Sequence, residues 1–160
     1  MVPLQRLSLA HARQTAALHR ASGALIPGYD TSLHTPAEDL DFHRRIVLVE
    51  NTVWGQFEGS DLVGFIAYQP GWIDHLYVRP DRLGRGIGSR LLIFAQSQQD
   101  TIRLYTFQSN VRARRFYERH GFVIEEMTDG ARNEEGMPDI TYLWRADQDR
   151  PTAHRQNPAW

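Results

Sequence analysis

The chain has 160 residues, a formal net charge of −1 and a hydrophobic fraction of 41%, which fit one globular domain. It contains no cysteine, which excludes disulfides, thiolate metal sites and a cysteine nucleophile. The near-neutral charge argues against nucleic acid as a partner, and no apolar run of about 20 residues predicts a membrane span.

The expected organisation is a single domain over residues 1–146 followed by a polar tail over 147–160. The first ten residues show no signal-peptide pattern, so we expect a cytoplasmic protein. The seven histidines are scattered and none follows a metal-binding spacing, so no metal is expected.

The first half of the chain predicts a strand, two helices and a meander of three strands. Apolar spacing places Ala17, Leu18, Ala21 and Leu25 on one face of the first helix. Thr35, Pro36 and Glu38 form a capping box that starts the second helix. The expected elements are a strand at 2–9, helices at 10–22 and 36–45, and strands at 46–54, 61–68 and 72–78, with a loop at 23–34.

The second half alternates between strands and helices. The expected elements are a helix at 86–99, a strand at 102–107, a helix at 110–120 closed by Gly121, and strands at 122–127 and 140–144. A meander followed by βαβαβ predicts an α/β (α+β) fold, with a mixed central sheet of about six to seven strands flanked by about four helices.

A glycine-rich turn follows the third meander strand and opens a helix. It reads Leu83-Gly84-Arg85-Gly86-Ile87-Gly88-Ser89, and three alternating glycines let a backbone approach a ligand closely. The first amides of a helix lack internal partners, so the turn can bind phosphate. Arg79, Arg82, Arg85 and Arg90 surround it and could reach further phosphates. An ordinary glycine turn before a helix is the alternative.

A second motif runs from Asn110 to Phe122. It combines Asn110 at a helix start, Ala113 one turn later, Phe116-Tyr117-Glu118, and Gly121-Phe122 at the exit. An amphipathic helix with Asn110 as its cap and Phe116 in the core explains the same residues, and both descriptions can hold together.

The two motifs together resemble the GNAT superfamily of N-acetyltransferases. The glycine turn is similar to that family's pyrophosphate motif, Gln/Arg-x-x-Gly-x-Gly/Ala, with Leu83 in place of the usual Gln or Arg. The later stretch is similar to its motif Asn-x-x-Ala-x-x-x-Tyr-Glu-x-x-Gly-Phe. The resemblance covers about residues 46–144 and implies direct acetyl transfer from acetyl-CoA to an amine in a ternary complex.

The resemblance also implies roles for particular residues. The amides of Leu83–Ser89 would bind the pyrophosphate, and the backbone of Leu76, Tyr77 and Val78 would pair with the pantetheine arm. Asn110, Ala113 and Phe116 would complete the cofactor site. The Leu76 backbone N–H would stabilise the oxyanion, and Tyr117 would protonate the leaving thiolate.

The proton acceptor for the amine is the least defined part of the prediction. Asp74 shares a strand face with Leu76, so it is expected either to accept the proton or to anchor the substrate ammonium. His75 points to the other face and is the poorer base, as are His34, Glu50 and Tyr68.

The acceptor is expected to be a small-molecule or peptide amine, and acidic loops suggest that it is cationic. These acids are Asp30, Glu38, Asp39, Asp41, Asp129, Glu134, Glu135 and Asp139, although ordinary solvated loops would look the same. Arg132 and Asn133 could instead bind a carboxylate. A homodimer is a further expectation from the resemblance.

Three other functions compete with this prediction. A non-catalytic acyl-CoA sensor would keep the phosphate turn and would not need Tyr117. A nicotinamide oxidoreductase is disfavoured by the glycine spacing and by Gln108-Ser109-Asn110, where an acidic residue is needed. A DNA-binding helix with Arg112, Arg114, Arg115 and Arg119 is disfavoured by the many nearby acids.

Overall fold

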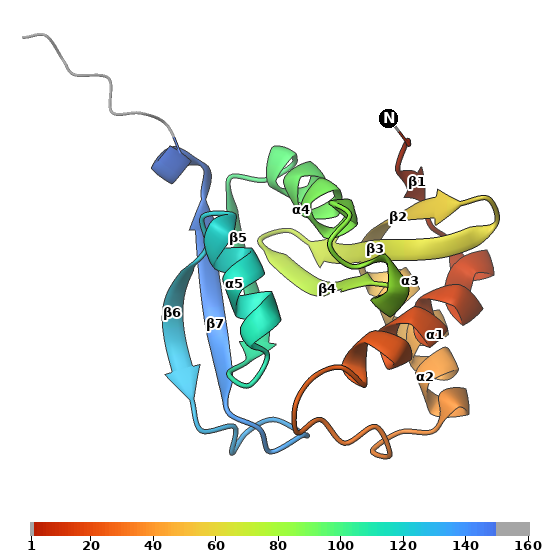
Figure 1. The fold of residues 1–160 in the computed structure, drawn as a ribbon, viewed down its shortest axis with the longest axis horizontal. Helices are drawn as coiled ribbons and strands as arrows, with labels where there is room; N and C mark the ends of the chain where they lie inside the picture. The colour runs from red at the N-terminus through yellow and green to blue at the C-terminus, as the bar shows by residue number, and fades with distance from the viewer. Residues whose placement is uncertain (1, 150–160) are drawn as a thin grey trace, which may run out of the picture.

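The computed structural model describes residues 2–149, so most of the expected polar tail lies outside the described residues. Seven strands form one mixed sheet in the order β1-β2-β3-β4-β5-β7-β6. Helices α1 and α2 lie on one side of the first sheet half, while α4 covers the other (Figure 1). The predicted mixed α/β architecture is confirmed.

The N-terminal helix has a different buried face from the expected one. Strand β1 is short (Gln5–Arg6), and a 3-10 turn at Leu9–His11 leads into α1 (Ala12–Gly23). The buried residues of α1 are Ala12, Thr15, Ala16, Leu18 and Gly23, whereas Ala17, Ala21 and Leu25 are exposed. The prediction therefore holds only for Leu18. Because alanines lie on both faces of this helix, the apolar spacing fits two different buried faces.

The second helical segment is longer than expected. The capping box of Thr35 and Glu38 starts α2 (Pro36–Phe42) as predicted. The helix then continues through a π-helical turn (His43–Val47) into α3 (Leu48–Glu50), where a strand had been expected from Ile46. Burial explains the error: His43 and Val47 are buried at a spacing of four while Ile46 is exposed, which is a helical period despite the β-branched residues.

Three antiparallel strands form the meander, namely β2 (Thr52–Glu58), β3 (Asp61–Gln69) and β4 (Trp72–Val78). Strand β3 is buried on both faces because α1 packs against one and α4 against the other. Gly64 is needed there, since a Cβ at this position would lie 2.7 Å from the Cγ2 of Ile87. The meander thus anchors the helix that follows the glycine turn.

The C-terminal half contains α4 (Ile87–Ser97), β5 (Thr101–Phe107), α5 (Val111–Arg119), β6 (Val123–Thr128) and β7 (Asp139–Arg145). Strand β7 inserts between β5 and β6 and is antiparallel to both. The larger core cluster joins the two halves, because it combines Val63, Ile66 and Ile73 of the meander with Leu91 and Leu104 of the second half. Within residues 2–149, no helix is both long enough and apolar enough to cross a membrane.

Candidate active site

The sheet opens between β4 and β5. These two strands are parallel and pair at one position in the described chain, Trp72 with Arg103, and they diverge beyond it. A cleft of about 1070 Å³ lies there, lined by β4, β5, α5, the end of α1 and the loop before β7. Strand edges that would otherwise be paired therefore face this cleft, where an extended ligand could bind them.

The glycine turn lies beside this opening, directly after β4. Gly84 and Gly86 have φ of 75° and 80°, a conformation that favours glycine, and no atom lies within 4 Å of a Cβ built at either. Helix α4 starts at Ile87 without a side-chain cap. Its first amides are therefore free to bind an anion, whereas the Ile87 side chain is buried in the core.

The arginines around the turn fall into two groups. The Arg79 Nε lies 2.6 Å from Asp81 Oδ1, and the Arg82 Nε lies 2.9 Å from Glu58 Oε2. These two side chains are thus occupied in holding the turn. Arg85 and Arg90 have no ion pair with any residue in the described part of the chain, so they are the cations left for a phosphate.

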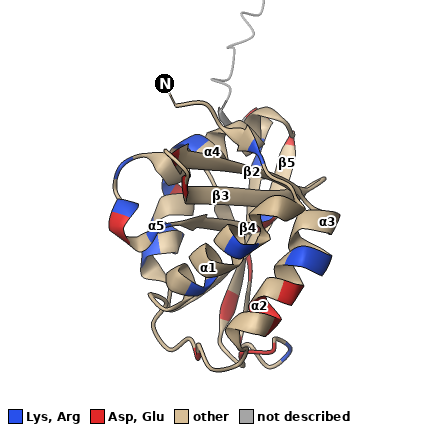
Figure 2. Cartoon of the chain, turned by 90° about the vertical axis from the view of Figure 1, so that its right-hand side faces the viewer, with Lys and Arg blue, Asp and Glu red and all other residues tan. Residues whose placement is uncertain are grey.

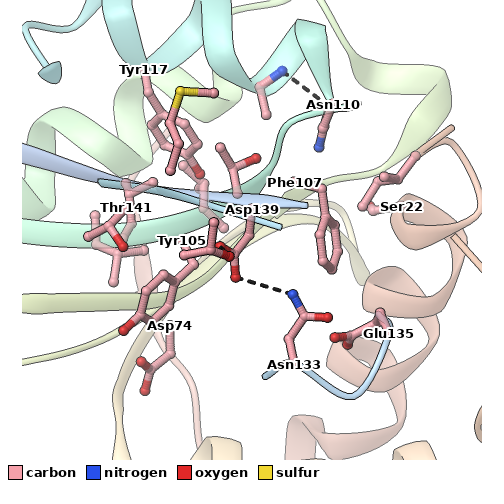
Figure 3. A pocket seen from close by; sticks show the side chains of 18 of the residues that line it. Ser22, Asp74, Tyr105, Phe107, Asn110, Tyr117, Asn133, Glu135, Asp139 and Thr141 are labelled. Atoms are coloured by element: carbon pink, nitrogen blue, oxygen red, sulfur yellow. Dashed lines mark hydrogen bonds between the residues drawn. The ribbon is translucent and has the colours of Figure 1, made fainter. Parts of the chain in front are cut away.

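Helix α5 supplies one wall of the cleft. Asn110 caps it by accepting a hydrogen bond from the Ala113 amide at 3.2 Å, and both residues line the cleft. The Tyr117 side chain reaches from α5 toward the middle of the cleft (Figure 3). Phe116 packs on Gly88, where a Cβ would lie 3.4 Å from its ring, so it joins α5 to α4. Burial raises the pKa of the Tyr117 phenol, which keeps it protonated at neutral pH.

Alternate residues of β4 face two different cavities. Asp74 and Leu76 line the cleft, as does Ile73, and a register irregularity in the pairing with β3 leaves Asp74 without a Cα partner. Asp74 is exposed and accepts a hydrogen bond from Gln69 Nε2 at 2.8 Å. His75 and Tyr77 line a second pocket of about 380 Å³ on the α1–α2 side. Tyr77 lines both cavities, and so do Ile26, Phe107 and Glu135. The two cavities are therefore adjacent.

Acidic residues surround the second pocket, and Figure 2 shows some of them on α2. The pocket is lined by Asp30, Glu38, Asp39, Glu134 and Glu135, whereas Asp41 pairs with Arg45 outside it. Arg20 neutralises Asp39 across a 2.5 Å contact, and His34 lies 3.0 Å from Glu134. Glu135 has no ion pair with any residue between 2 and 149.

The loop before β7 is held by its own side chains. Asn133 donates through Nδ2 to the Met137 carbonyl at 2.7 Å and to Asp139 Oδ2 at 3.2 Å (Figure 3). Its Oδ1 accepts from the Met137 amide at 3.1 Å. The expectation that Asn133 binds a substrate carboxylate is therefore wrong, because its polar atoms already shape the loop. Arg132 still lines the cleft.

Sequence reasoning missed several residues of the second pocket. His19, Tyr29 and Phe107 come from a helix, a loop and a strand end, so no local spacing relates them. The only local signal was an aromatic residue, Tyr29, in the loop at 23–34.

Comparison with known proteins agrees with this geometry. The family model "Acetyltransferase (GNAT) domain" matches residues 44–124. The peptidyl-lysine N-acetyltransferase YiaC of Escherichia coli (strain K12) is 33% identical over 76 residues, which are 47% of this chain and 51% of the relative. The matched stretch thus spans about half the length of that curated relative.

Solved structures extend the likeness to the whole fold. Apo YjaB from Escherichia coli has a TM-score of 0.74 at 21% identity, covering 90% of this chain and 97% of the other. The PaiA N-acetyltransferase from Thermoplasma acidophilum, solved with coenzyme A, has a TM-score of 0.66 at 20% identity, covering 91% and 99%. The chain belongs to the GNAT acetyltransferase family, as its two motifs indicated.

Proposed function

We propose that the protein transfers an acetyl group from acetyl-CoA to an amine by direct attack. The main support is the opened β4–β5 cleft, which has an uncapped helix start beside it and the Tyr117 side chain inside it. A sensor that binds acyl-CoA without catalysis would need the first two features and would have no use for a protonated phenol in the cleft.

The residues present fit coenzyme A. The amides of Leu83–Ser89 would hold its pyrophosphate, helped by Arg85 and Arg90, which form no ion pair within residues 2–149. The β4 backbone at Leu76, Tyr77 and Val78 would hold the pantetheine arm, and Asn110 and Ala113 line the same cleft. Phe116 would contribute by fixing α5 against Gly88. When bound, acetyl-CoA supplies the thioester whose acetyl group is transferred.

Three groups of this chain would then assist the transfer. The Leu76 backbone N–H would donate a hydrogen bond to the carbonyl oxygen as its negative charge grows. Tyr117 would give its proton to the departing sulfur, because its raised pKa keeps the proton available. Asp74 would hold the incoming ammonium, since its exposure and its hydrogen bond to Gln69 suit an anchor better than a base.

The acceptor would be a primary amine on a cationic small molecule or a peptide lysine. The acidic lining of the second pocket supports a cation, and the relative YiaC is named for acetylating peptide lysines. A cytoplasmic location and a homodimer remain parts of the proposal. The open edge strand β6 exposes Val123, Ile124 and Met127, which a second copy could cover.

Two measurements test the proposal together. Calorimetry with coenzyme A tests the phosphate turn, and release of free thiol from acetyl-CoA is followed with a panel of diamines, aminoglycosides and lysine peptides. We expect coenzyme A to bind and at least one amine to release thiol. Binding without any amine-dependent thiol release would favour the sensor, and absence of binding would reject both functions.

A further inference from the structure

Three imidazoles meet behind β4, in a place that the motifs do not mark. His19 comes from α1, His43 from the π-helical turn and His75 from β4. The ring centroid of His19 lies 5.2 Å from that of His43 and 5.1 Å from that of His75. Within residues 2–149 no histidine or carboxylate cluster has the arrangement of a metal site. The cluster therefore calls for another explanation.

A directed chain of hydrogen bonds fixes the tautomers of two of these rings. The Thr15 hydroxyl donates to the Ala12 carbonyl at 3.2 Å, so its oxygen can only accept from His43 Nδ1, 2.9 Å away. The proton of His43 is then on Nδ1, and its Nε2 accepts from His19 Nδ1 at 2.9 Å. His19 Nε2, at the end of this series of hydrogen bonds, then carries a lone pair that can accept a proton.

His19, the last residue of this hydrogen-bonded chain, is part of the lining of the second pocket. His19 and His75 both line it, and no hydrogen bond in residues 2–149 uses His19 Nε2. His19 stacks on Tyr77 with centroids 4.5 Å apart, and Tyr77 also lines the cleft. His75 Nδ1 is buried without a partner in the described chain, which is costly unless a ligand or water satisfies it.

We propose that His19 is the proton acceptor for the attacking amine, with His43 and Thr15 as positioning residues that hold its ring. This inference rests on the acetyl transfer proposed above. The bound ammonium first loses one proton to solvent, which gives the neutral amine that can attack. As this nitrogen bonds to the acetyl carbon and the carbon–sulfur bond breaks, its second departing proton moves to His19 Nε2. The sulfur takes a proton from Tyr117, and solvent returns both groups to their starting states.

The electrostatics of the pocket suit this role. Burial lowers the pKa of His19 to about 4, partly opposed by Asp39, so its ring is neutral and able to accept at neutral pH. A weak base is sufficient because the nitrogen becomes acidic only when its bond to carbon forms. His43 contacts the His19 ring directly. The charged or titratable groups that line the same pocket as His19 are Arg20, Tyr29, Asp30, His34, Glu38, Asp39, His75, Tyr77, Glu134 and Glu135.

The decisive experiment compares two matched sets of variants with the wild-type enzyme. His19→Ala should lose about 100-fold in kcat, as expected for a lost general base, while its affinity for coenzyme A stays unchanged. Added imidazole should restore part of that activity. Thr15→Val removes the hydroxyl at constant shape and should lower kcat, whereas Thr15→Ser should keep it. His11→Gln, which retains a capping side chain far from the pocket, serves as the control.

A second readout does not depend on turnover. Nitrogen-15 NMR should find His19 and His43 of the wild-type protein as neutral Nδ1–H tautomers at pH 7, and Thr15→Val should alter the His43 signal first. A His19 Nε2–H tautomer would overturn the proposal, as would a His19→Ala enzyme with wild-type kcat or no response to imidazole. If the wild-type enzyme acetylates no amine, the proposed function itself fails, which is a different result.

Discussion

The cofactor side and the acceptor side of this protein are built in different ways. The proposed cofactor side consists mainly of two short stretches, residues 83–89 and 110–122, whose backbone geometry would do most of the binding. The acceptor side is assembled from side chains of α1, α2, β4 and two loops that are far apart in the sequence. The cofactor side can therefore be predicted from local sequence motifs. The acceptor side cannot, because its residues come together only in the folded protein.

The largest effect should come from Tyr117, whose side chain lines the cleft. Tyr117→Phe removes the only proton that the side chain can give, and we expect kcat to fall by about 100-fold or more. Affinity for coenzyme A should stay close to wild type, because the substitution removes one hydroxyl and leaves the phosphate turn and the β4 backbone unchanged. Thiol-release kinetics with parallel calorimetry measures both. An unchanged kcat would remove Tyr117 from the mechanism.

Acid should destabilise the acceptor side selectively. Burial lowers the pKa of His43 and of His75 to about 3, and that of His19 to about 4. Below about pH 6.5 the histidines of the unfolded chain take up protons, whereas those of the folded cluster stay neutral until the pH is much lower. Stability from the neutral rings is thus full above about pH 6.5 and is lost as pH falls toward 4.

Urea unfolding at several pH values measures this loss. For each ring, the free energy of unfolding should fall by at most about 1.4 kcal/mol for every pH unit that the pH is lowered within that window. The slope should shrink in His43→Gln, which cannot take up the proton. If that variant kept the wild-type slope, the histidine would already be charged in the folded protein.

On the cofactor side, backbone conformation should matter more than side-chain identity. Gly86→Ala places a Cβ at a φ of 80°, which costs about 1–2 kcal/mol and should weaken coenzyme A binding about tenfold. Gly59→Ala is the matched control, since Gly59 also has positive φ and open space around its Cβ position but lies in the β2–β3 hairpin. Both should lower Tm similarly, and equal losses of affinity would argue against the phosphate turn.

Much of the fold could be predicted from the sequence, and the larger failures come from contacts between segments far apart in the chain. Glycines, prolines and capping residues marked the starts of α2, α4 and α5 and the end of α5, because they act on neighbouring backbone atoms. The run Ile46–Val49 was mistaken for a strand because its helical burial depends on α1, which no local pattern reveals. In the same way, the sequence spacing of His19 and His43 does not predict their contact, which forms because α1 packs against the π-helical turn.

Charge on the acceptor side should give a smaller effect. Glu135 lines both cavities and has no ion pair with any residue from 2 to 149, so it is free to attract a cationic amine. Glu135→Gln should raise KM for dicationic amines up to about fivefold, the range of an exposed ion pair, with less change for monoamines. Glu50→Gln is the control, because Glu50 is exposed on α3 and lines neither cavity. Equal KM changes in both variants would indicate general charge steering.

The smallest effect should separate Asp74 from His19. Asp74 faces the cleft from β4 and is exposed to solvent, so an ammonium bound to it stays partly hydrated and gains little. Asp74→Asn should therefore raise KM about threefold and leave kcat and its pH profile unchanged. A base at this position would behave in the opposite way, with a lower kcat, a changed pH profile and a constant KM. That outcome would make Asp74, on the cleft side of β4, the proton acceptor in place of His19 on the other side. Asp74 would then take part in the chemical step and not only in binding the acceptor.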